Sequence, residues 1–114
     1  MYMAPLFSGS SGNSILIEAA GTRLLIDAGK PAKTIEEGLS SFSLSLKDID
    51  ALLITHEHTD HIAGAGVLAR KYKIPVYANS STWRAMEMNI GNVPAGCRRE
   101  FETGRDFYIG NVNI

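Results

Sequence analysis

All three histidines of this 114-residue chain lie in one short window, His56-Glu57-His58-Thr59-Asp60-His61. The window follows residues 49–55, which contain the continuous apolar run Ala51-Leu52-Leu53-Ile54, typical of a strand covered on both faces. It precedes residues 62–72, whose apolar spacing predicts a helix. The chain must therefore fold so that a buried strand delivers a histidine cluster to a strand–helix junction.

The residue types and spacing of this window predict a metal site. Side chains two residues apart share one side of an extended chain, so His56 and His58 can bind one ion together. Asp60 and His61 fall at the start of the next helix and can face a second ion. Imidazole and carboxylate groups suit zinc, manganese or iron rather than calcium. The alternative is that these are three surface histidines in a turn. The specificity of the pattern disfavours this alternative.

Two divalent metal ions in one site predict hydrolysis. Metal ions about 3.5–4 Å apart lower the pKa of a bridging water and polarise the bond to be cut. The expected nucleophile is then the metal-bound hydroxide. Asp60 is the predicted catalytic residue, because it would bind one metal ion and orient that water.

Asp27 is a further candidate, because it ends the predicted strand 23–27 and precedes Ala28-Gly29. It is either a turn aspartate that bonds to its own backbone or a carboxylate that holds the histidine loop from behind the metal ligands. The small-residue loop at 8–13 also has two interpretations. It is a simple connection, or it brings Ser10, Ser11 and Asn13 to the mouth of the site as substrate contacts.

The remaining pattern alternates strands with helices and contains no repeats. Strands are predicted at 14–18, 23–27, 49–55 and 74–78, and a hairpin at 107–114. Helices are predicted from Pro31 through Phe42, over 62–72, and from Ser80 or Ser81 to Met88. This alternation is typical of an α/β (or α+β) domain.

Composition limits the class of protein. The net charge of −1 gives no general attraction to nucleic acid or acidic lipid. The N-terminal residues lack the features of a secretory signal, and no segment is long enough to span a bilayer. The single cysteine, Cys97, cannot form an internal disulfide and is expected to be a buried thiol rather than a metal ligand. We therefore expect one small cytoplasmic domain.

These residues resemble the metallo-β-lactamase fold superfamily of hydrolases. Residues 55–61 match its metal-binding signature, and Leu25-Ile26-Asp27-Ala28-Gly29 resembles its earlier aspartate motif. The loop 8–14, residues 24–29 and the block 51–78 are similar to the YycJ/WalJ-like branch in particular.

The resemblance implies an αββα sandwich, of which residues 1–114 form the N-terminal half: one mixed sheet with helices on its outer face. It implies a dinuclear site, with His56 and His58 on one metal ion, Asp60 and His61 on the other, and Asp27 behind them. The branch implies a cytoplasmic DNA exonuclease that hydrolyses phosphodiesters. Later ligands of the family (a histidine, a bridging aspartate and a last histidine) have no counterpart here, so we expect a truncated domain that is inactive alone.

Two other functions remain open from the sequence, a thioester or lactone hydrolase of the same superfamily and a catalytically inactive fragment that persists by association. In the family fold, the inner face of this half packs on the C-terminal half. Without that C-terminal half, the face that contains Leu16, Leu25 and Leu53 would be an apolar surface exposed to water. We therefore expect either the missing half or a second copy of the chain as the partner.

Overall fold

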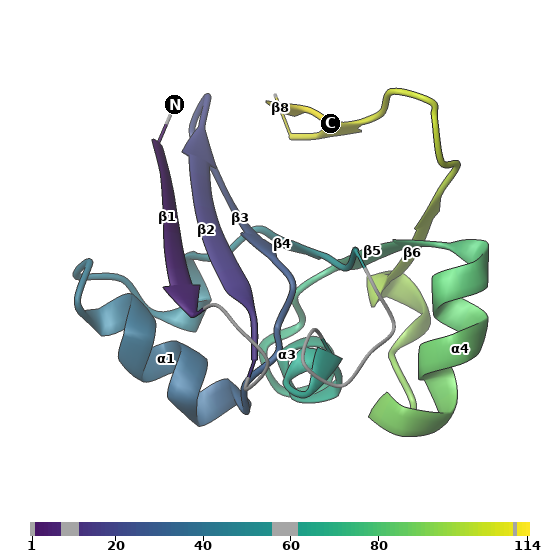
Figure 1. Ribbon diagram of the computed structural model, residues 1–114, viewed down its shortest axis with the longest axis horizontal. Coiled ribbons are helices and arrows are strands. Elements are labelled where there is room, and N and C mark those ends of the chain that lie inside the picture. The colour runs from purple at the N-terminus through teal and green to yellow at the C-terminus, as the bar shows by residue number, and fades with distance from the viewer. Residues whose placement is uncertain (1, 8–11, 56–61, 111) are drawn as a thin grey trace.

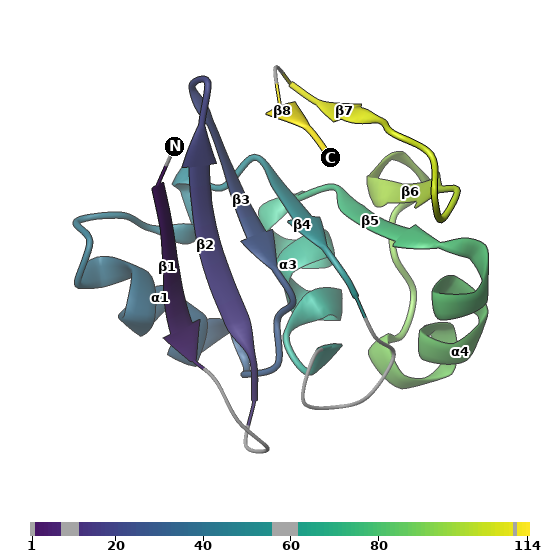
Figure 2. The ribbon, with the colours of Figure 1, turned by 45° about the horizontal axis from the view of Figure 1, so that its top comes forward.

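The computed structural model describes residues 2–7, 12–55, 62–110 and 112–114 (Figures 1 and 2). In this part of the chain, six strands form one mixed sheet, in the order in which they occur in the sequence. The strands are β1 (Tyr2–Phe7), β2 (Ser14–Ala19), β3 (Thr22–Ile26), β4 (Ala51–Leu53), β5 (Val76–Asn79) and β6 (Arg98–Phe101). The helices are α1 (Ala32–Ser40), α3 (Ala65–Tyr72) and α4 (Ser80–Ile90), with 3-10 turns at Leu46–Asp48 and Ala95–Cys97.

The topology brings the carboxyl ends of four neighbouring strands to one edge. Strands β1, β2 and β3 pair antiparallel, and β3, β4, β5 and β6 pair parallel. Each parallel step crosses over through one helix, so α1, α3 and α4 lie on the same side of the sheet (Figure 1). Whatever follows β3 and β4 therefore meets at the same edge as the ends of β5 and β6.

The main core lies between the sheet and these helices. Leu16 of β2, Leu25 of β3 and Leu52 of β4 point to this side and are fully buried. Helix α1 adds Ile35 and Leu39, as the helical spacing predicted. The prediction that Leu16 and Leu25 belong to an open face is therefore wrong, because their strands place them under the helices.

The opposite face of the sheet carries a smaller core. The hairpin β7 (Tyr108–Ile109) and β8 (Val112–Asn113) lies over it, on the side away from the helices (Figure 1). Ile109 is buried there against Leu24 and Ala51. The predicted hairpin is confirmed, and it covers part of the face that was expected to be bare. The homodimer stays a prediction.

Three details differ from the sequence-based assignment. Strands β1 and β6 were not predicted. Helix α3 begins at Ala65 rather than at residue 62. Helix α4 is capped by Asn79, whose side-chain carbonyl accepts a hydrogen bond from the Thr82 N–H at 2.8 Å, and not by Ser80 or Ser81.

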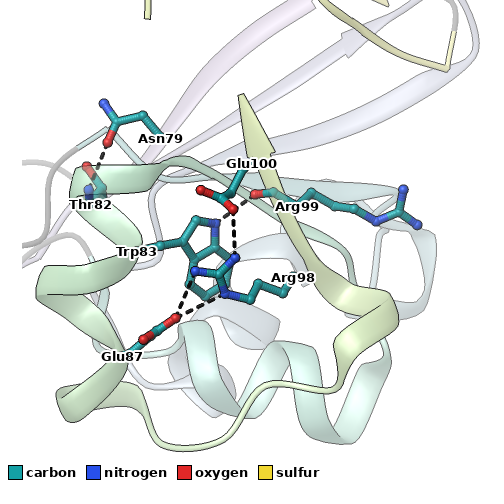
Figure 3. A network of polar contacts seen from close by, with 7 residues as sticks. All are labelled: Asn79, Thr82, Trp83, Glu87, Arg98, Arg99 and Glu100. Carbon is teal, nitrogen blue, oxygen red and sulfur yellow. Dashed lines mark hydrogen bonds and ion pairs between the residues drawn. The ribbon is translucent and has the colours of Figure 1, made fainter. Parts of the chain in front are cut away.

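Side-chain contacts with α4 hold the edge strand β6 (Figure 3). The Trp83 indole N–H donates to the Arg99 carbonyl at 2.7 Å, and the Arg98 guanidinium lies 4.8 Å from the centre of the Trp83 ring system. Arg98 also pairs with Glu87 at 2.9 Å and Glu100 at 3.0 Å. Hydrogen bonds to Glu100 and then Glu87 raise the pKa of Arg98 above its ordinary value, so its positive charge is secure.

Candidate metal centre

Asp27 joins the ends of β3 and β4. It is the residue directly after β3, its side chain is 5% exposed, and its φ is +67°, a left-handed conformation that aspartate tolerates better than most residues. Its Oδ1 accepts a hydrogen bond from the Thr55 N–H at 2.7 Å, and its Oδ2 accepts one from the Thr55 hydroxyl at 2.6 Å. Its own N–H donates to the Leu53 carbonyl at 2.7 Å. Thr55, which directly precedes the histidine window, is therefore held by both oxygens of one carboxylate.

The residues after Asp27 hold the other side of the window. The Ala28 carbonyl accepts a hydrogen bond from the Gly64 N–H at 2.8 Å, and the Gly29 N–H donates to the Asn13 carbonyl at 2.8 Å. Ala28 is fully buried in the main core. Residues 27–29 therefore bind the residue before the histidine window, the approach to α3 after it, and the start of β2.

Glycine is required where these segments meet. A Cβ atom on Gly64 would lie 2.4 Å from the Lys30 carbonyl oxygen, closer than side-chain carbons approach backbone. Gly12 has φ +143°, and a Cβ there would lie 2.7 Å from the Gly29 carbonyl oxygen. Close backbone approach at both positions makes the contact between the three loops possible.

The predicted ligands His56, His58, Asp60 and His61 lie outside the described residues, as do Ser10 and Ser11. Asn13 is described, half-buried, and bonds to Gly29 through its backbone carbonyl. Among the described residues, no group of three or more His, Cys, Asp or Glu side chains could hold a metal ion. The described structure thus supplies the supports on either side of the window, and the roles of its residues stay predictions.

Cys97 lies away from this edge. It is 6% exposed within the core on the helix-covered face, and its thiol contacts the Ala69 carbonyl at 3.8 Å. This burial agrees with the expected packing thiol.

Two of the supporting contacts had no signal in the sequence. The Gly64 N–H meets the Ala28 carbonyl only because two crossover connections converge, and no local pattern indicates that. The bonds from Thr55 to Asp27 join residues 28 positions apart. Asp27 itself was identified, but Thr55 as its partner was not.

Comparison with known proteins agrees with this arrangement. The family profile described as the metallo-beta-lactamase superfamily matches residues 8–111. The chain belongs to this superfamily. It is 42% identical over 114 residues to "Exodeoxyribonuclease YycJ" of Bacillus anthracis, and the match spans 100% of this chain and 43% of the relative. It is 47% identical over 111 residues to "Exodeoxyribonuclease WalJ" of Streptococcus pneumoniae, and the match spans 96% of this chain and 41% of the relative.

Solved structures agree on the fold. The metallo-β-lactamase MEM-A1, a subclass B3 enzyme from a soil metagenome library, superposes with a TM-score of 0.74 at 23% identity, over 97% of this chain and 47% of that one. The superfamily predicted from the motifs is confirmed, and so is the mixed sheet with helices on one face. The chain matches the N-terminal part of its relatives and spans less than half of their length.

None of the helices in the described ranges has the length and apolar character needed to cross a bilayer. The cytoplasmic location stays a prediction.

Proposed function

We propose that this chain is part of a metal-dependent nuclease that hydrolyses phosphodiester bonds of DNA. The observation that carries the proposal is its similarity to two proteins named exodeoxyribonucleases, at 42% and 47% identity over at least 96% of this chain. The activity belongs to a protein of the relatives' length, since this chain spans less than half of it.

We assign the metal ions to His56 and His58 on one side and to Asp60 and His61 on the other. Three imidazoles and one carboxylate form a donor set that suits zinc, manganese or iron. The described supports fit this assignment, because Thr55 and Gly64 are fixed on either side of the window. When bound, two such ions supply Lewis-acid activation of water and stabilisation of negative charge on phosphate.

The protein's own groups supply the positioning. Asp27 holds Thr55 through its backbone N–H and its hydroxyl, so the chain leaves β4 in a fixed direction toward His56. The Ala28 carbonyl fixes the chain again at Gly64. Asp60, which we assign as a metal ligand, would orient the water that the metal ions activate. This preorganisation is what a rigid scaffold contributes to a metal site.

The experiment that tests this function measures hydrolysis of linear DNA with added zinc or manganese. We expect the 114-residue chain alone to be inactive and a version extended to the length of its relatives to be active. Asp60→Asn in the extended version should lower the rate at least about 100-fold. Asp106→Asn is the matched control, because Asp106 is an exposed carboxylate that is not among the assigned metal ligands, and it should leave the rate unchanged. Equal rates for Asp60→Asn and the unmodified protein would contradict the assignment.

A further inference from the structure

Three aromatic rings stack near the carboxyl edge of the sheet, on its face opposite the helices. Phe107 lies between Tyr77 of β5 and Phe101 of β6, with ring centroids 5.9 Å and 4.7 Å away and interplanar angles of 19° and 14°. All three side chains are half-buried. Tyr77 and Phe107 pack against the smaller core, whereas Phe101 lies outside both cores. Phe101 therefore ends the stack, and its ring is supported by Phe107.

A hollow of about 530 Å³ opens beside Phe101. It is lined by Phe101, by Asn79 and Ser80 at the start of α4, and by Glu100, Glu102 and Thr103. The Asn79 side chain fixes two of these walls, because its carbonyl accepts from the Thr82 N–H at 2.8 Å and its amide donates to the Thr103 hydroxyl at 2.9 Å. The residues that line the hollow therefore combine one aromatic side chain with hydroxyl and carboxylate groups.

The strand register places this hollow at the same edge of the sheet as Thr55, which directly precedes the histidine window in the chain. Leu53 of β4 is opposite Tyr77 of β5, and Asn79 is opposite Phe101 of β6. The Ile54 N–H donates to the Tyr77 carbonyl at 2.8 Å, so Thr55, the next residue, follows β4 at the same edge of the sheet as Asn79 and Phe101. Neighbouring strands lie about 4.8 Å apart, so about 10 Å separates the ends of β4 and β6.

We propose that this hollow is a base subsite, in which a nucleobase of a single-stranded DNA substrate stacks on Phe101. The inference rests on the proposed function and names how that substrate is bound. Aromatic side chains bind single strands by stacking, with little sequence preference, because every base has a π-face. Glu100 pairs with Arg98 at 3.0 Å and Glu102 with Arg105 at 3.3 Å, so the hollow offers carboxylate oxygens whose charge is already balanced. Such oxygens accept hydrogen bonds from the exocyclic amino groups of bases. The base, rather than the backbone, is therefore the part of the nucleotide that enters the hollow.

The test uses the chain as it stands, in EDTA, so that metal ions and hydrolysis contribute nothing. A single-stranded trideoxynucleotide of cytosine and the same trimer without bases are titrated into the protein, followed by the amide NMR shifts of β5 and β6. We expect the base-bearing trimer to bind about 5- to 150-fold more tightly, the range that corresponds to about 1–3 kcal/mol for a stacked base.

Three variants locate the effect. Phe101→Leu removes the ring and keeps most of its volume, and should bring the affinity ratio close to one. Phe101→Trp should preserve the ratio. Tyr2→Leu is the matched control. Tyr2 lies on β1, the edge strand farthest from β6, and its partly exposed ring contacts the ring of Phe42. This change should leave the affinity ratio unchanged. Circular dichroism checks that each variant is folded, and the ratio in the unmodified protein tests the proposal even if Phe101→Leu does not fold.

Equal binding of the two trimers, no shifts at millimolar trimer, or an unchanged ratio in Phe101→Leu would overturn the base subsite. These outcomes are distinct from failure of the proposed function. A protein that prefers the base-bearing trimer but never hydrolyses DNA contradicts the nuclease and leaves the subsite standing. An extended protein that hydrolyses DNA with and without bases equally well contradicts the subsite alone.

Discussion

The two ends of the β3–β4 pair use the same chemistry in different surroundings. At the carboxyl end, Asp27 is 5% exposed and accepts two hydrogen bonds from Thr55 through both of its oxygens. At the amino end, Asp50 is exposed, and its Oδ2 accepts a hydrogen bond from the Arg23 N–H at 2.9 Å. Each carboxylate ties its strand to the neighbouring one. Only the end that leads into the histidine window carries a buried carboxylate with φ in the left-handed region.

The comparison teaches where this small domain is rigid. A hydrogen bond to a buried charged group costs more to lose than one at the surface, where water replaces the partner. The carboxyl edge is therefore the end of the sheet that holds its loops most firmly. A metal site needs this, because its ligands must keep a fixed geometry.

The largest effect should follow Asp27→Ala. The change removes the acceptor of two charge-assisted hydrogen bonds, each worth at least about 1.5 kcal/mol, so the free energy of unfolding should fall by about 3 kcal/mol. Urea denaturation measures it. Asp50→Ala is the matched control at the other end of the pair, with an expected loss of about 1 kcal/mol. Equal losses for the two variants would remove the distinction between the two ends.

Gly64→Ala should have the next largest effect. Its new Cβ atom would lie 2.4 Å from the Lys30 carbonyl oxygen, so the loop after β3 and the approach to α3 must move apart. Such overpacking costs about 1–3 kcal/mol. Gly96→Ala serves as the control, because a Cβ there meets nothing within 4 Å, and it should not lower the melting temperature. Identical melting temperatures for both variants would show that the contact is not tight.

Arg98→Met should have a smaller effect, because its partners are at the surface. The ion pairs to Glu87 and Glu100 join side chains that are 34% to 47% exposed, and such pairs contribute up to about 1 kcal/mol. The loss should shrink in 1 M salt, where the pairs are screened. Arg105→Met, at a pair whose side chains are 75% and 72% exposed, should give no measurable change. A loss from Arg98→Met that is independent of salt would assign its role to packing on Trp83 instead.

The sequence predicted the central strands because they bury apolar side chains on both faces. Ala51, Leu52 and Ile54 are all at most 1% exposed, as their continuous apolar run indicated. Strand β6 carries Arg98 and Glu100 on its helix side, where ion pairs replace apolar contacts, so it shows no apolar alternation. Strand β1 is an edge strand that contains Pro5, which lowers its strand signal.

In the candidate site, too, some features could be predicted from the sequence and others could not. The histidine window was recognisable because its chemistry lies in consecutive residues. The contacts that support it join residues far apart, such as Gly64 and Ala28, and depend on the packing of two crossover connections. The aromatic stack was not predicted either, because Tyr77, Phe101 and Phe107 come from three separate segments.

We infer that Asp27 positions the histidine window for metal binding. Isothermal titration of zinc into Asp27→Asn tests it, because this change keeps the size and backbone preference of the side chain while removing its charge. We expect zinc binding about 10- to 100-fold weaker than in the unmodified chain. We expect no binding by His58→Ala and unchanged binding by Asp50→Asn and Cys97→Ala. Unchanged zinc affinity in Asp27→Asn, with binding lost in His58→Ala, would contradict it.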